Sequence, residues 1–405
     1  MALVAMLIAG CLLLAACRRD SAQVDAPLPR VVADVSTEQV LRSEQASLRL
    51  RPLVTGLEHP WAVAELPDGD LLVTERPGRL RRISLRDAKV SPPIKGLPAL
   101  YVDGQAGLLD VVVSPDFRND GLVYLAFAEP NLRGNLCGTA VARGRLQGDA
   151  LQDVEVIYRQ TPKKSAGTHL GARLVFDRTG NLFVTQGEHR LYPHAAQDMG
   201  SLQGKVVRIT PGGNIPADNP FANQDAPRGY IWSLGHRNVQ GAALHPVTGE
   251  LWTSEHGPKG GDELNITRAG KNYGWPIITD GVHYDGKPVE GSTGRTAPGM
   301  EVPLHSWTPS PALSGMAFHG GQGIPAWKGS LFMGALAGRR LIRVELDDDK
   351  VVHEEALLTD LGERIRDVRV TARGTLYVLT DAAEGQLLEL VPTPLPATGQ
   401  QTSSQ

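Results

Sequence analysis

One short pattern recurs along this chain, and it constrains the fold more than any other feature of the sequence. A turn containing glycine leads into a run of alternating apolar residues, and in most copies a polar break and a second run follow. Glycine permits the tight turn of a β-hairpin, and the alternation gives each strand one buried face. Six copies occur, within residues 67–83, 120–125, 179–209, 248–254, 328–344 and 373–390.

The spacing of these copies favours a β-propeller over other all-β folds. Successive copies begin 45 to 80 residues apart, which suits a four-stranded blade with loops of variable length. A two-sheet sandwich is the alternative, but it gives no reason for the same pattern to return at this interval. The sequence therefore predicts an all-β, six-bladed β-propeller of four-stranded antiparallel blades.

The N-terminal segment is almost wholly apolar and ends at Leu14-Ala15-Ala16-Cys17, which resembles the lipobox of bacterial lipoproteins. The run is too short for a permanent membrane-spanning helix, so it predicts a lipoprotein-type signal peptide over residues 1–16. An ordinary secretory signal cleaved near Ala16 is the alternative, and both predict export. We therefore expect a periplasmic or cell-envelope location, with membrane attachment through a lipid on Cys17.

Three further segments follow this signal. Residues 17–45 are polar and predict a flexible tether, residues 46–391 predict the propeller domain, and residues 392–405 predict a disordered tail. After cleavage, Cys137 is the only thiol besides Cys17. An exported protein without an internal disulfide must be stabilised by its core.

The charge balance excludes one class of function. The chain has 41 Lys and Arg against 44 Asp and Glu, a net charge of −3, and no long basic run. A protein that binds nucleic acid non-specifically needs a basic surface. We therefore expect no nucleic-acid partner.

Polar side chains beside glycines gather in the segments between the repeats. These segments are 103–109, 167–176, 234–241, 254–263, 272–276 and 364–368. The loops at one end of a propeller channel converge, and glycine lets the backbone approach a ligand closely. We expect the chemistry in these segments, although each one alone is equally well explained as a solvated loop.

His169 is the strongest candidate for a general base, because it stands just before a predicted strand and histidine titrates near neutral pH. Glu188 lies beyond that strand and the one after it, where a carboxylate can orient the imidazole and stabilise its protonated form. A single histidine is more often structural, so the pair is a hypothesis. The sequence contains no Gly-x-Ser-x-Gly or His-Glu-x-x-His motif and no zinc-type spacing of Cys and His.

Three arginines, Arg237, Arg364 and Arg366, are expected near one mouth of the channel. Three guanidinium groups suit a small planar anion that carries several carboxylates, and arginines in surface turns are the alternative. The loop 255–263 contains Gly257-Pro258 and can offer carbonyl and carboxylate oxygens to a hard cation, and a ligand set of oxygens alone selects Ca²⁺ rather than zinc. The loop lacks the spacing of an EF-hand, so composition alone supports calcium only weakly.

Taken in order, these segments resemble the soluble pyrroloquinoline quinone (PQQ)-dependent sugar dehydrogenases, and especially the bacterial aldose sugar dehydrogenases. The resemblance runs from about Thr55 to about Val391. It is most specific in the block Leu-Gly-His-Arg-Asn at 234–238, in Glu-His-Gly-Pro at 255–258 and in Asn-Tyr-Gly-Trp-Pro at 272–276. It implies a six-bladed propeller that binds PQQ over the channel mouth beside a calcium ion.

The resemblance also implies roles for single residues. His169 matches the general base that takes the proton from the anomeric hydroxyl of the sugar, and Glu188 matches the acidic residue behind it. Arg237 matches a catalytic group at the reactive face of the quinone. The other implied cofactor contacts are Gln105, Asn238, Tyr284, Arg364 and Arg366, and the implied calcium ligands are Gly257 and Pro258, with Glu263 and Tyr273 at a second calcium.

Two positions depart from the family pattern. Related enzymes often carry a lysine near Ala337 that reaches the cofactor, and neither Arg339 nor Arg340 is in register to replace it. Thr168 stands where an acidic residue often precedes the base. The first departure bears on cofactor affinity and not on the fold.

The activity implied is oxidation of the C1 hydroxyl of an aldose to a lactone, with hydride transfer to PQQ, Ca²⁺ as Lewis acid and an electron acceptor in the cell envelope. The alternatives are a quinoprotein acting on sorbosone-type aldehydes, a non-catalytic ligand-binding propeller lipoprotein, and a calcium-dependent lactonase. A binding propeller predicts loss of the base or the arginines, and a lactonase needs several converging carboxylates. The dehydrogenase is therefore favoured.

Overall fold

The computed structural model describes residues 29–32 and 38–393. The predicted signal peptide, Cys17 and residues 394–405 of the predicted tail lie outside the described residues. In the part of the chain that is described, no helix is long and apolar enough to cross a membrane.

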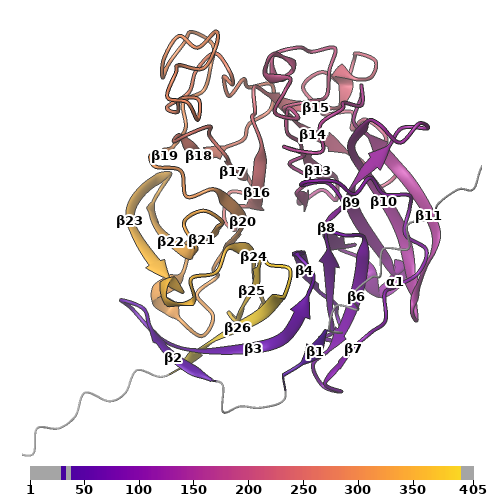
Figure 1. Ribbon diagram of the computed structural model, residues 1–405, viewed down its shortest axis with the longest axis vertical. Coiled ribbons are helices and arrows are strands. Elements are labelled where there is room, and N and C mark those ends of the chain that lie inside the picture. The colour runs from indigo at the N-terminus through magenta and orange to yellow at the C-terminus, as the bar shows by residue number, and fades with distance from the viewer. Residues whose placement is uncertain (1–28, 33–37, 394–405) are drawn as a thin grey trace, which may run out of the picture.

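Six antiparallel sheets stand around a central axis (Figure 1), which confirms the predicted propeller of four-stranded blades. In five blades the strands follow one another in chain order from the axis outward. These strands are β4 (Pro60–Glu65), β5 (Leu71–Glu75), β6 (Arg79–Ser84) and β7 (Lys89–Val90); β8 (Leu108–Val113), β9 (Leu122–Pro130), β10 (Cys137–Gln147) and β11 (Ala150–Arg159); β12 (Leu174–Phe176), β13 (Leu182–Thr185), β14 (Lys205–Ile209) and β15 (Ile231–Leu234); β16 (Val239–Leu244), β17 (Leu251–Glu255), β18 (Asp262–Ile266) and β19 (His305–Trp307); and β20 (Leu313–Phe318), β21 (Leu331–Ala335), β22 (Arg340–Asp347) and β23 (Lys350–Leu357).

The sixth blade joins the two ends of the propeller domain. Its inner strands are β24 (Ile365–Val370), β25 (Leu376–Thr380) and β26 (Gly385–Thr393), and its fourth strand is β3 (Ser47–Leu57) from the N-terminal side. β26 pairs antiparallel with β3 along almost its whole length. Backbone hydrogen bonds between segments more than 300 residues apart therefore close the ring.

The outer edge of β3 is also paired, which corrects one expectation. The short strands β1 (Arg30–Val31) and β2 (Gln39–Arg42) both pair antiparallel with β3. The prediction of a flexible tether over residues 17–45 is therefore wrong for these two stretches, because they cover backbone groups that β3 would otherwise leave open. The last strand likewise runs two residues beyond the predicted domain end at residue 391.

The repeated sequence pattern corresponds to the middle strands of the blades. The second strand is buried along its whole length in five blades, as β5, β13, β17, β21 and β25. Such strands are apolar because neighbouring blades cover both of their faces. This burial makes them the most visible strands in the sequence.

The innermost strands are less regular. The ladder between the first and second strand is interrupted in five blades, and it skips Trp61 in β4, Gln240 in β16 and Arg366 in β24. A β-bulge of this kind turns a side chain away from its regular position, commonly beside an active site. All three skipped side chains line the pocket described below.

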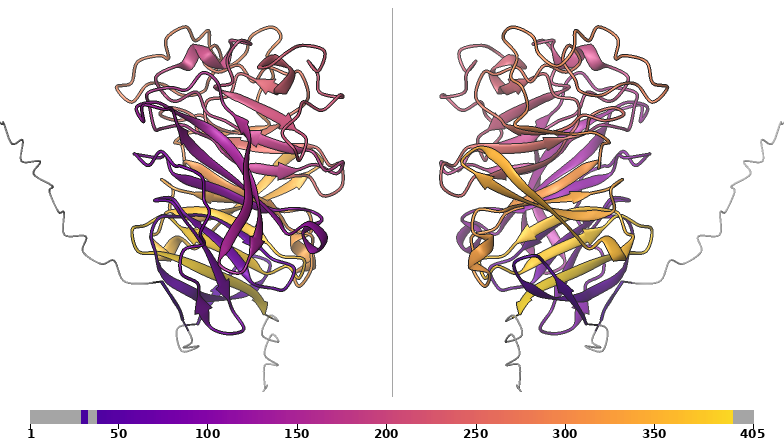
Figure 2. Two further views of the ribbon diagram at one scale, coloured as in Figure 1. Left: turned by 90° about the vertical axis from the view of Figure 1, so that its right-hand side faces the viewer. Right: turned by 90° about the vertical axis from the view of Figure 1, so that its left-hand side faces the viewer.

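Little of the described chain is helical. One short helix, α1 (Phe117–Asp120), precedes β9, and four 3₁₀ turns occur at Pro193–Ala196, Arg228–Tyr230, Pro325–Trp327 and Thr359–Leu361. The long connections from β14 to β15 and from β18 to β19 form the upper end of the molecule in the side views of Figure 2.

Candidate active site

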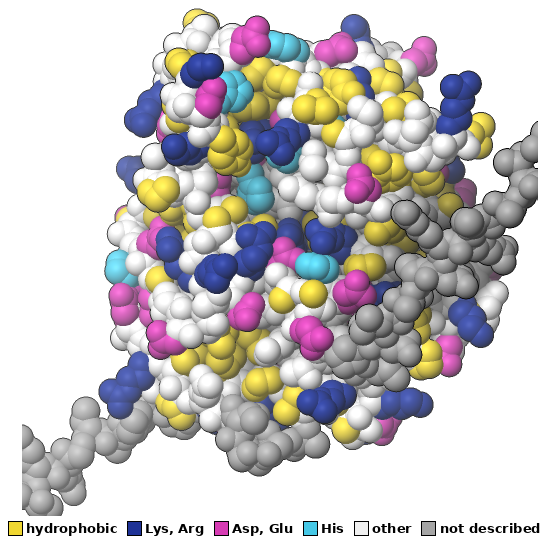
Figure 3. Space-filling view, viewed as in Figure 1, with side chains coloured by type: hydrophobic (Ala, Val, Ile, Leu, Met, Phe, Trp, Pro, Cys, Tyr) yellow, Lys and Arg dark blue, Asp and Glu magenta, His cyan; other side chains and the backbone are white. Residues whose placement is uncertain are grey.

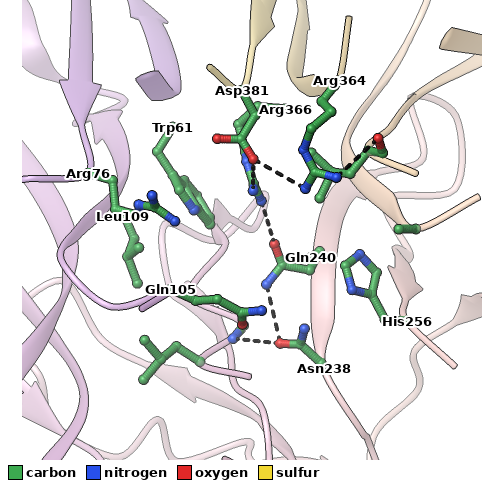
Figure 4. A pocket seen from close by; sticks show the side chains of 14 residues that line it. Trp61, Arg76, Gln105, Leu109, Asn238, Gln240, His256, Arg364, Arg366 and Asp381 are labelled. Carbon is green, nitrogen blue, oxygen red and sulfur yellow. Dashed lines mark hydrogen bonds and ion pairs between the residues drawn. The ribbon is translucent and has the colours of Figure 1, made fainter. Parts of the chain in front are cut away.

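A pocket on the propeller axis draws its lining from all six blades (Figure 4). The lining residues lie at the start of an innermost strand or just after the end of a second strand, and these two positions meet at the same end of an antiparallel blade. They are Trp61, Arg76, Gln105, Leu109, Leu170, Gly171, Asn238, Gln240, His256, Ala312, Leu336, Arg364, Arg366 and Asp381. Of the predicted site residues, Gln105, Asn238, Arg364 and Arg366 thus lie in one lining.

One wall of the pocket is built around Asp381. Its Oδ2 lies 2.6 Å from Nη2 of Arg366 and 3.4 Å from Nη2 of Arg364, and its Oδ1 lies 3.2 Å from Nδ1 of His59. Burial would raise the pKa of Asp381, but the two arginines outweigh burial and hold the pKa well below its ordinary value. Asp381 is therefore a fixed anion shared by three cationic or hydrogen-bonding groups.

The same wall contains a donor without a partner. Arg366 donates from Nη1 to Oε1 of Gln240 at 3.0 Å, while its buried Nε has no partner among the described residues. A buried donor of this kind is costly unless a ligand accepts from it. The Nε of Arg366 is therefore available to an acceptor group of a ligand.

Arg76 is a third arginine of this pocket, and the sequence did not predict it. It lies on the other side of Trp61 and Asp381 from Arg364 (Figure 4). Three guanidinium groups thus face one lining carboxylate, Asp381. Figure 3 shows the result as basic side chains gathered around the hollow at the centre of this face.

The predicted base and its acidic partner are in direct contact; neither is in the pocket lining, but His169 directly precedes the lining residues Leu170 and Gly171. Nδ1 of His169 lies 2.8 Å from Oε2 of Glu188, and both side chains are buried. The backbone N–H of His169 donates to Oε1 of Gln105 at 2.9 Å, which ties the base to the pocket lining. Burial lowers the pKa of His169, and the charge of Glu188 only partly opposes this shift.

The backbone around this pair is strained. His169, Ala172, His189 and Arg190 all have positive φ, between 49° and 80°. Gly187 lies between His169 and Asn238, and a Cβ at this position would come within 2.0 Å of the carbonyl oxygen of His169. Unfavourable backbone geometry concentrated at one place is typical of functional sites, where the surroundings hold side chains in position.

A buried carboxylate fixes the loop that carries Arg237 and Asn238. Glu255 accepts from the backbone N–H of Arg237 at 2.6 Å and lies 2.9 Å from Nδ1 of His236. The Arg237 side chain is not in the pocket lining itself; Nη1 donates to the carbonyl oxygens of His256 and Gly257 at 3.0 and 2.7 Å. Asn238 accepts from the N–H of Gly171 at 3.1 Å, close to His169 in the chain. The loop thus joins the base to the pocket.

The four predicted calcium ligands fall in two places. Gly257 and Pro258 are buried beside Arg237, with the Gly257 carbonyl directed at its guanidinium. Glu263 is half-buried and pairs with Glu255 across β17 and β18, and desolvation and that neighbouring charge raise its pKa well above the ordinary value. Tyr273 stacks on His236 and donates to the carbonyl of Ile266. The described residues contain no group of three or more His, Cys, Asp or Glu side chains arranged for a metal ion.

Three other positions from the sequence lie away from the pocket. Tyr284, predicted as a cofactor contact, is 67% exposed and is not in the lining. Arg339 donates to the carbonyl of Gly362, and Arg340 lies 3.8 Å from Glu354. Neither arginine therefore replaces, in the pocket, the lysine that related enzymes carry near position 337.

A buried ion network lies behind the pocket lining and contacts the backbone of Gln240 and Arg366. Nη1 of Arg173 lies 3.0 Å from Asp367 and 3.5 Å from Asp110, and its Nε donates to the carbonyl of Gln240 at 2.8 Å. Arg369 contacts both carboxylates from below, at 3.0 Å from Asp110 and 3.4 Å from Asp367. These side chains come from the second, third and sixth blades, and Arg173 also donates to the backbone carbonyls of Gln240 in the fourth blade and of Arg366.

Similarity to known proteins agrees with this geometry. Residues 57–389 match the family described as Glucose / Sorbosone dehydrogenase. The chain is 44% identical over 361 residues to aldose sugar dehydrogenase YliI of Escherichia coli (strain K12), covering 88% of this chain and 96% of that protein. A crystal structure of a glucose dehydrogenase is 52% identical with a TM-score of 0.82, covering 85% of this chain and 99% of the other.

A structure with bound cofactor is also similar. The PQQ-bound form of an aldose sugar dehydrogenase from Streptomyces coelicolor is 28% identical with a TM-score of 0.71, and the alignment covers 86% of this chain and 99% of that one. The propeller fold, the axial pocket and a family match over most of the chain lead to one conclusion. This protein belongs to the glucose/sorbosone dehydrogenase family.

Proposed function

We propose that this protein is an exported, PQQ-dependent dehydrogenase that oxidises the C1 hydroxyl of aldose sugars to lactones and passes the electrons to an acceptor in the cell envelope. One observation carries the proposal. A buried histidine with a carboxylate on its Nδ1 directly precedes Leu170 and Gly171 of a pocket lining that holds three guanidinium groups and one carboxylate. The relatives named as sugar dehydrogenases support the same substrate class.

The pocket fits the charge of PQQ, a planar molecule with three carboxylates. Arg76, Arg364 and Arg366 exceed the single lining carboxylate, Asp381, by two positive charges, and Arg366 Nε lacks a partner among the described residues. The indole of Trp61 adds a flat apolar surface in the same lining. When bound, PQQ would accept the two electrons and the hydrogen that leave the sugar C1.

His169 has the protonation state that a base requires. Because Nδ1 is directed at the Glu188 carboxylate, Nδ1 carries the proton and Nε2 is the basic nitrogen. Burial lowers the pKa of His169 and keeps the ring neutral near pH 7. His169 can therefore accept the hydroxyl proton from the sugar, and Glu188 then stabilises the charged imidazole.

A calcium ion is part of this proposal. The Gly257 carbonyl already accepts from a cationic group, Nη1 of Arg237 at 2.7 Å, and the Pro258 carbonyl is its neighbour in the chain. Main-chain carbonyl oxygens are ligands that Ca²⁺ prefers. Gly257 and Pro258 would hold calcium beside the cofactor, and Arg237 lies where it can stabilise negative charge that develops next to it.

Export and lipid attachment are proposed on the sequence of residues 1–17 alone, since apolar residues up to Ala16 precede Cys17. Mass spectrometry of the protein purified from native membranes tests this point. A mature chain that begins at a lipid-modified Cys17 would support attachment, and an unmodified chain recovered in the soluble fraction would contradict it.

Reconstitution tests the activity. Protein lacking residues 1–17 is mixed with PQQ and Ca²⁺, and reduction of an artificial dye is followed with a panel of aldoses. We expect dye reduction that requires both additions and a sugar, and that is lost in His169→Ala. Binding of PQQ without oxidation of any aldose would contradict the substrate, and the panel is then extended to sorbosone-type aldehydes. Failure to bind PQQ would contradict the proposal and favour a ligand-binding propeller.

A further inference from the structure

Arg76 is held at the pocket mouth by the backbone of two blades. It directly follows β5, its N–H donates to the carbonyl of His59 at 3.1 Å, and its own carbonyl accepts from the N–H of Leu108 at 3.0 Å. Gly107 makes the second contact feasible, because a Cβ there would come within 1.9 Å of the Arg76 carbonyl oxygen. The position of Arg76 between the first and second blades is therefore fixed without any contribution from its side chain.

Two carboxylates close to Arg76, its chain neighbour Glu75 and Glu58, are paired with other arginines. Oε2 of Glu75 lies 2.7 Å from Nε of Arg79 and 2.6 Å from Nε of Arg81. Glu58 lies 2.6 Å from Nη2 of Arg79. No hydrogen bond or ion pair from another described residue reaches the guanidinium of Arg76.

Asp381 does not neutralise Arg76 either. This carboxylate is shared by Arg366, Arg364 and His59. Burial lowers the pKa of Arg76, and the positive charges of Arg366 and Arg364 add to this effect, while Asp381 opposes it. Arg76 is thus a half-buried cation that faces like charges and has a hydrogen-bonding fork free for a ligand.

We propose that Arg76 binds a carboxylate of PQQ, on the side of the pocket opposite to Arg364 and Arg366. This inference rests on the proposed function and adds a cofactor-binding residue from the first blade. Guanidinium groups on opposite sides of Trp61, from Arg76 and Arg364, suit a ligand with at least two separated anionic groups. Arg76 also gives the pocket a third cation although position 337 is alanine.

The experiment measures PQQ binding to the cofactor-free protein by quenching of tryptophan fluorescence, in the presence of Ca²⁺. We expect Arg76→Gln to weaken PQQ binding about 10-fold or more. Arg76→Lys keeps the charge without the planar fork, so its PQQ affinity should lie between those of wild type and Arg76→Gln. The trimethyl ester of PQQ, whose carboxylates carry no charge, should bind wild type and Arg76→Gln equally.

Two controls separate this inference from loss of structure. Arg339→Gln should leave PQQ binding unchanged, because Arg339 donates to the carbonyl of Gly362 outside the pocket. The melting temperature of cofactor-free Arg76→Gln should be equal to or above that of wild type, because the substitution removes repulsion between like charges.

Each outcome has one meaning. Equal PQQ affinity of wild type and Arg76→Gln would overturn the role of Arg76 and leave the proposed function intact. Weaker PQQ binding in Arg339→Gln but not in Arg76→Gln would overturn the role of Arg76 and assign the contact to Arg339 of the fifth blade. If wild type itself fails to bind PQQ, the proposed function fails, and this inference fails with it.

Discussion

His169 and Glu188 are joined by a 2.8 Å contact between Nδ1 and Oε2, and both belong to the third blade. The same Glu188 oxygen also accepts from the backbone N–H of Arg190 at 3.1 Å, so the carboxylate is fixed from two sides. The imidazole is therefore held in one tautomer with Nε2 as the basic nitrogen. Contacts within the protein alone thus hold the base in the orientation that proton transfer needs.

The first prediction concerns the base itself. His169→Gln should reduce kcat with an aldose by about 10² to 10⁴, the usual contribution of a general base, while PQQ affinity changes little. Steady-state kinetics and fluorescence titration measure the two effects separately. His353→Gln, an exposed histidine on β23, is the control and should behave as wild type. Retention of full activity in His169→Gln would show that another group takes the proton.

The second prediction concerns pH. Activity should fall on the acid side as His169 becomes protonated, with an apparent pKa below the ordinary 6.5, because burial disfavours the charged ring. Glu188 raises this pKa, so Glu188→Gln should move the acid limb of kcat/KM to lower pH. The plateau should also fall by about 10², because the charged imidazole loses its partner.

The control for this pH profile is Glu384→Gln, which changes an exposed carboxylate of the sixth blade. It should leave the profile unchanged. An acid limb that moves to higher pH in Glu188→Gln would contradict the assignment of Glu188 as the partner of the base.

The third prediction concerns Gln240, which uses both ends of its amide. Its Oε1 accepts from Arg366 at 3.0 Å, and its Nε2 donates to Oδ1 of Asn238 at 3.2 Å. Gln240→Glu keeps the shape but replaces the donor with an anionic oxygen beside Asn238 and near the expected carboxylates of the cofactor. PQQ affinity should fall about 10-fold. Gln240→Met, which removes both bonds without adding charge, should have a smaller effect; the opposite order would exclude an electrostatic role.

The sequence predicted those parts of the molecule that depend on local pattern. The middle strands of the blades were visible because neighbouring blades bury both of their faces, as in β5 and β25. The glycine-rich segments placed Gln105, Asn238 and the two arginines of β24 and its preceding loop near one mouth. Such predictions succeed because the strand pattern and the glycine turns are local properties of the chain.

The parts that the sequence did not predict depend on contacts between blades. Trp61 and Gln240 reach the pocket through bulges, and a bulge follows from the packing of the innermost strands around the axis. Arg76 and Asp381 each follow directly on a second strand, so in the sequence they look like ordinary hairpin residues. One signal was present for Arg76: Glu75 is followed by three arginines within six positions, Arg76, Arg79 and Arg81, more than one carboxylate can pair with.

The fourth prediction concerns calcium. Glu263, which is half-buried, pairs with the buried Glu255 across β17 and β18, and two like charges so placed are unfavourable without a cation or a proton between them. Ca²⁺ should therefore raise the melting temperature of the cofactor-free protein, in proportion to the logarithm of its concentration above Kd. In Glu263→Gln the rise should be smaller. Mg²⁺ at the same ionic strength is the control for screening, and an equal effect of both ions would exclude a selective site.

The last prediction concerns the ion network under the pocket. Arg173 is buried between Asp367 at 3.0 Å and Asp110 at 3.5 Å, and it also lies 4.2 Å from the ring of Trp61. Arg173→Met should lower the free energy of unfolding by about 3–5 kcal/mol, because two buried carboxylates lose a shared cation and keep Arg369 as their one arginine partner, beside backbone N–H donors. Chemical denaturation at pH 7 measures this loss, with the exposed Arg86→Met as a control expected to change by less than about 0.5 kcal/mol.

The carboxylates, rather than the lost volume, are the cause of this instability, and a second substitution separates the two. Burial already raises the pKa of Asp110 in the wild-type protein, against the opposing charges of Arg369 and Arg173. In Arg173→Met the pKa rises further, so the deficit should shrink as the pH is lowered and the carboxylates become neutral. Combining Arg173→Met with Asp110→Asn should recover part of the loss, because one unpaired charge is removed. Strict additivity of the two substitutions would show that the residues do not act as a network.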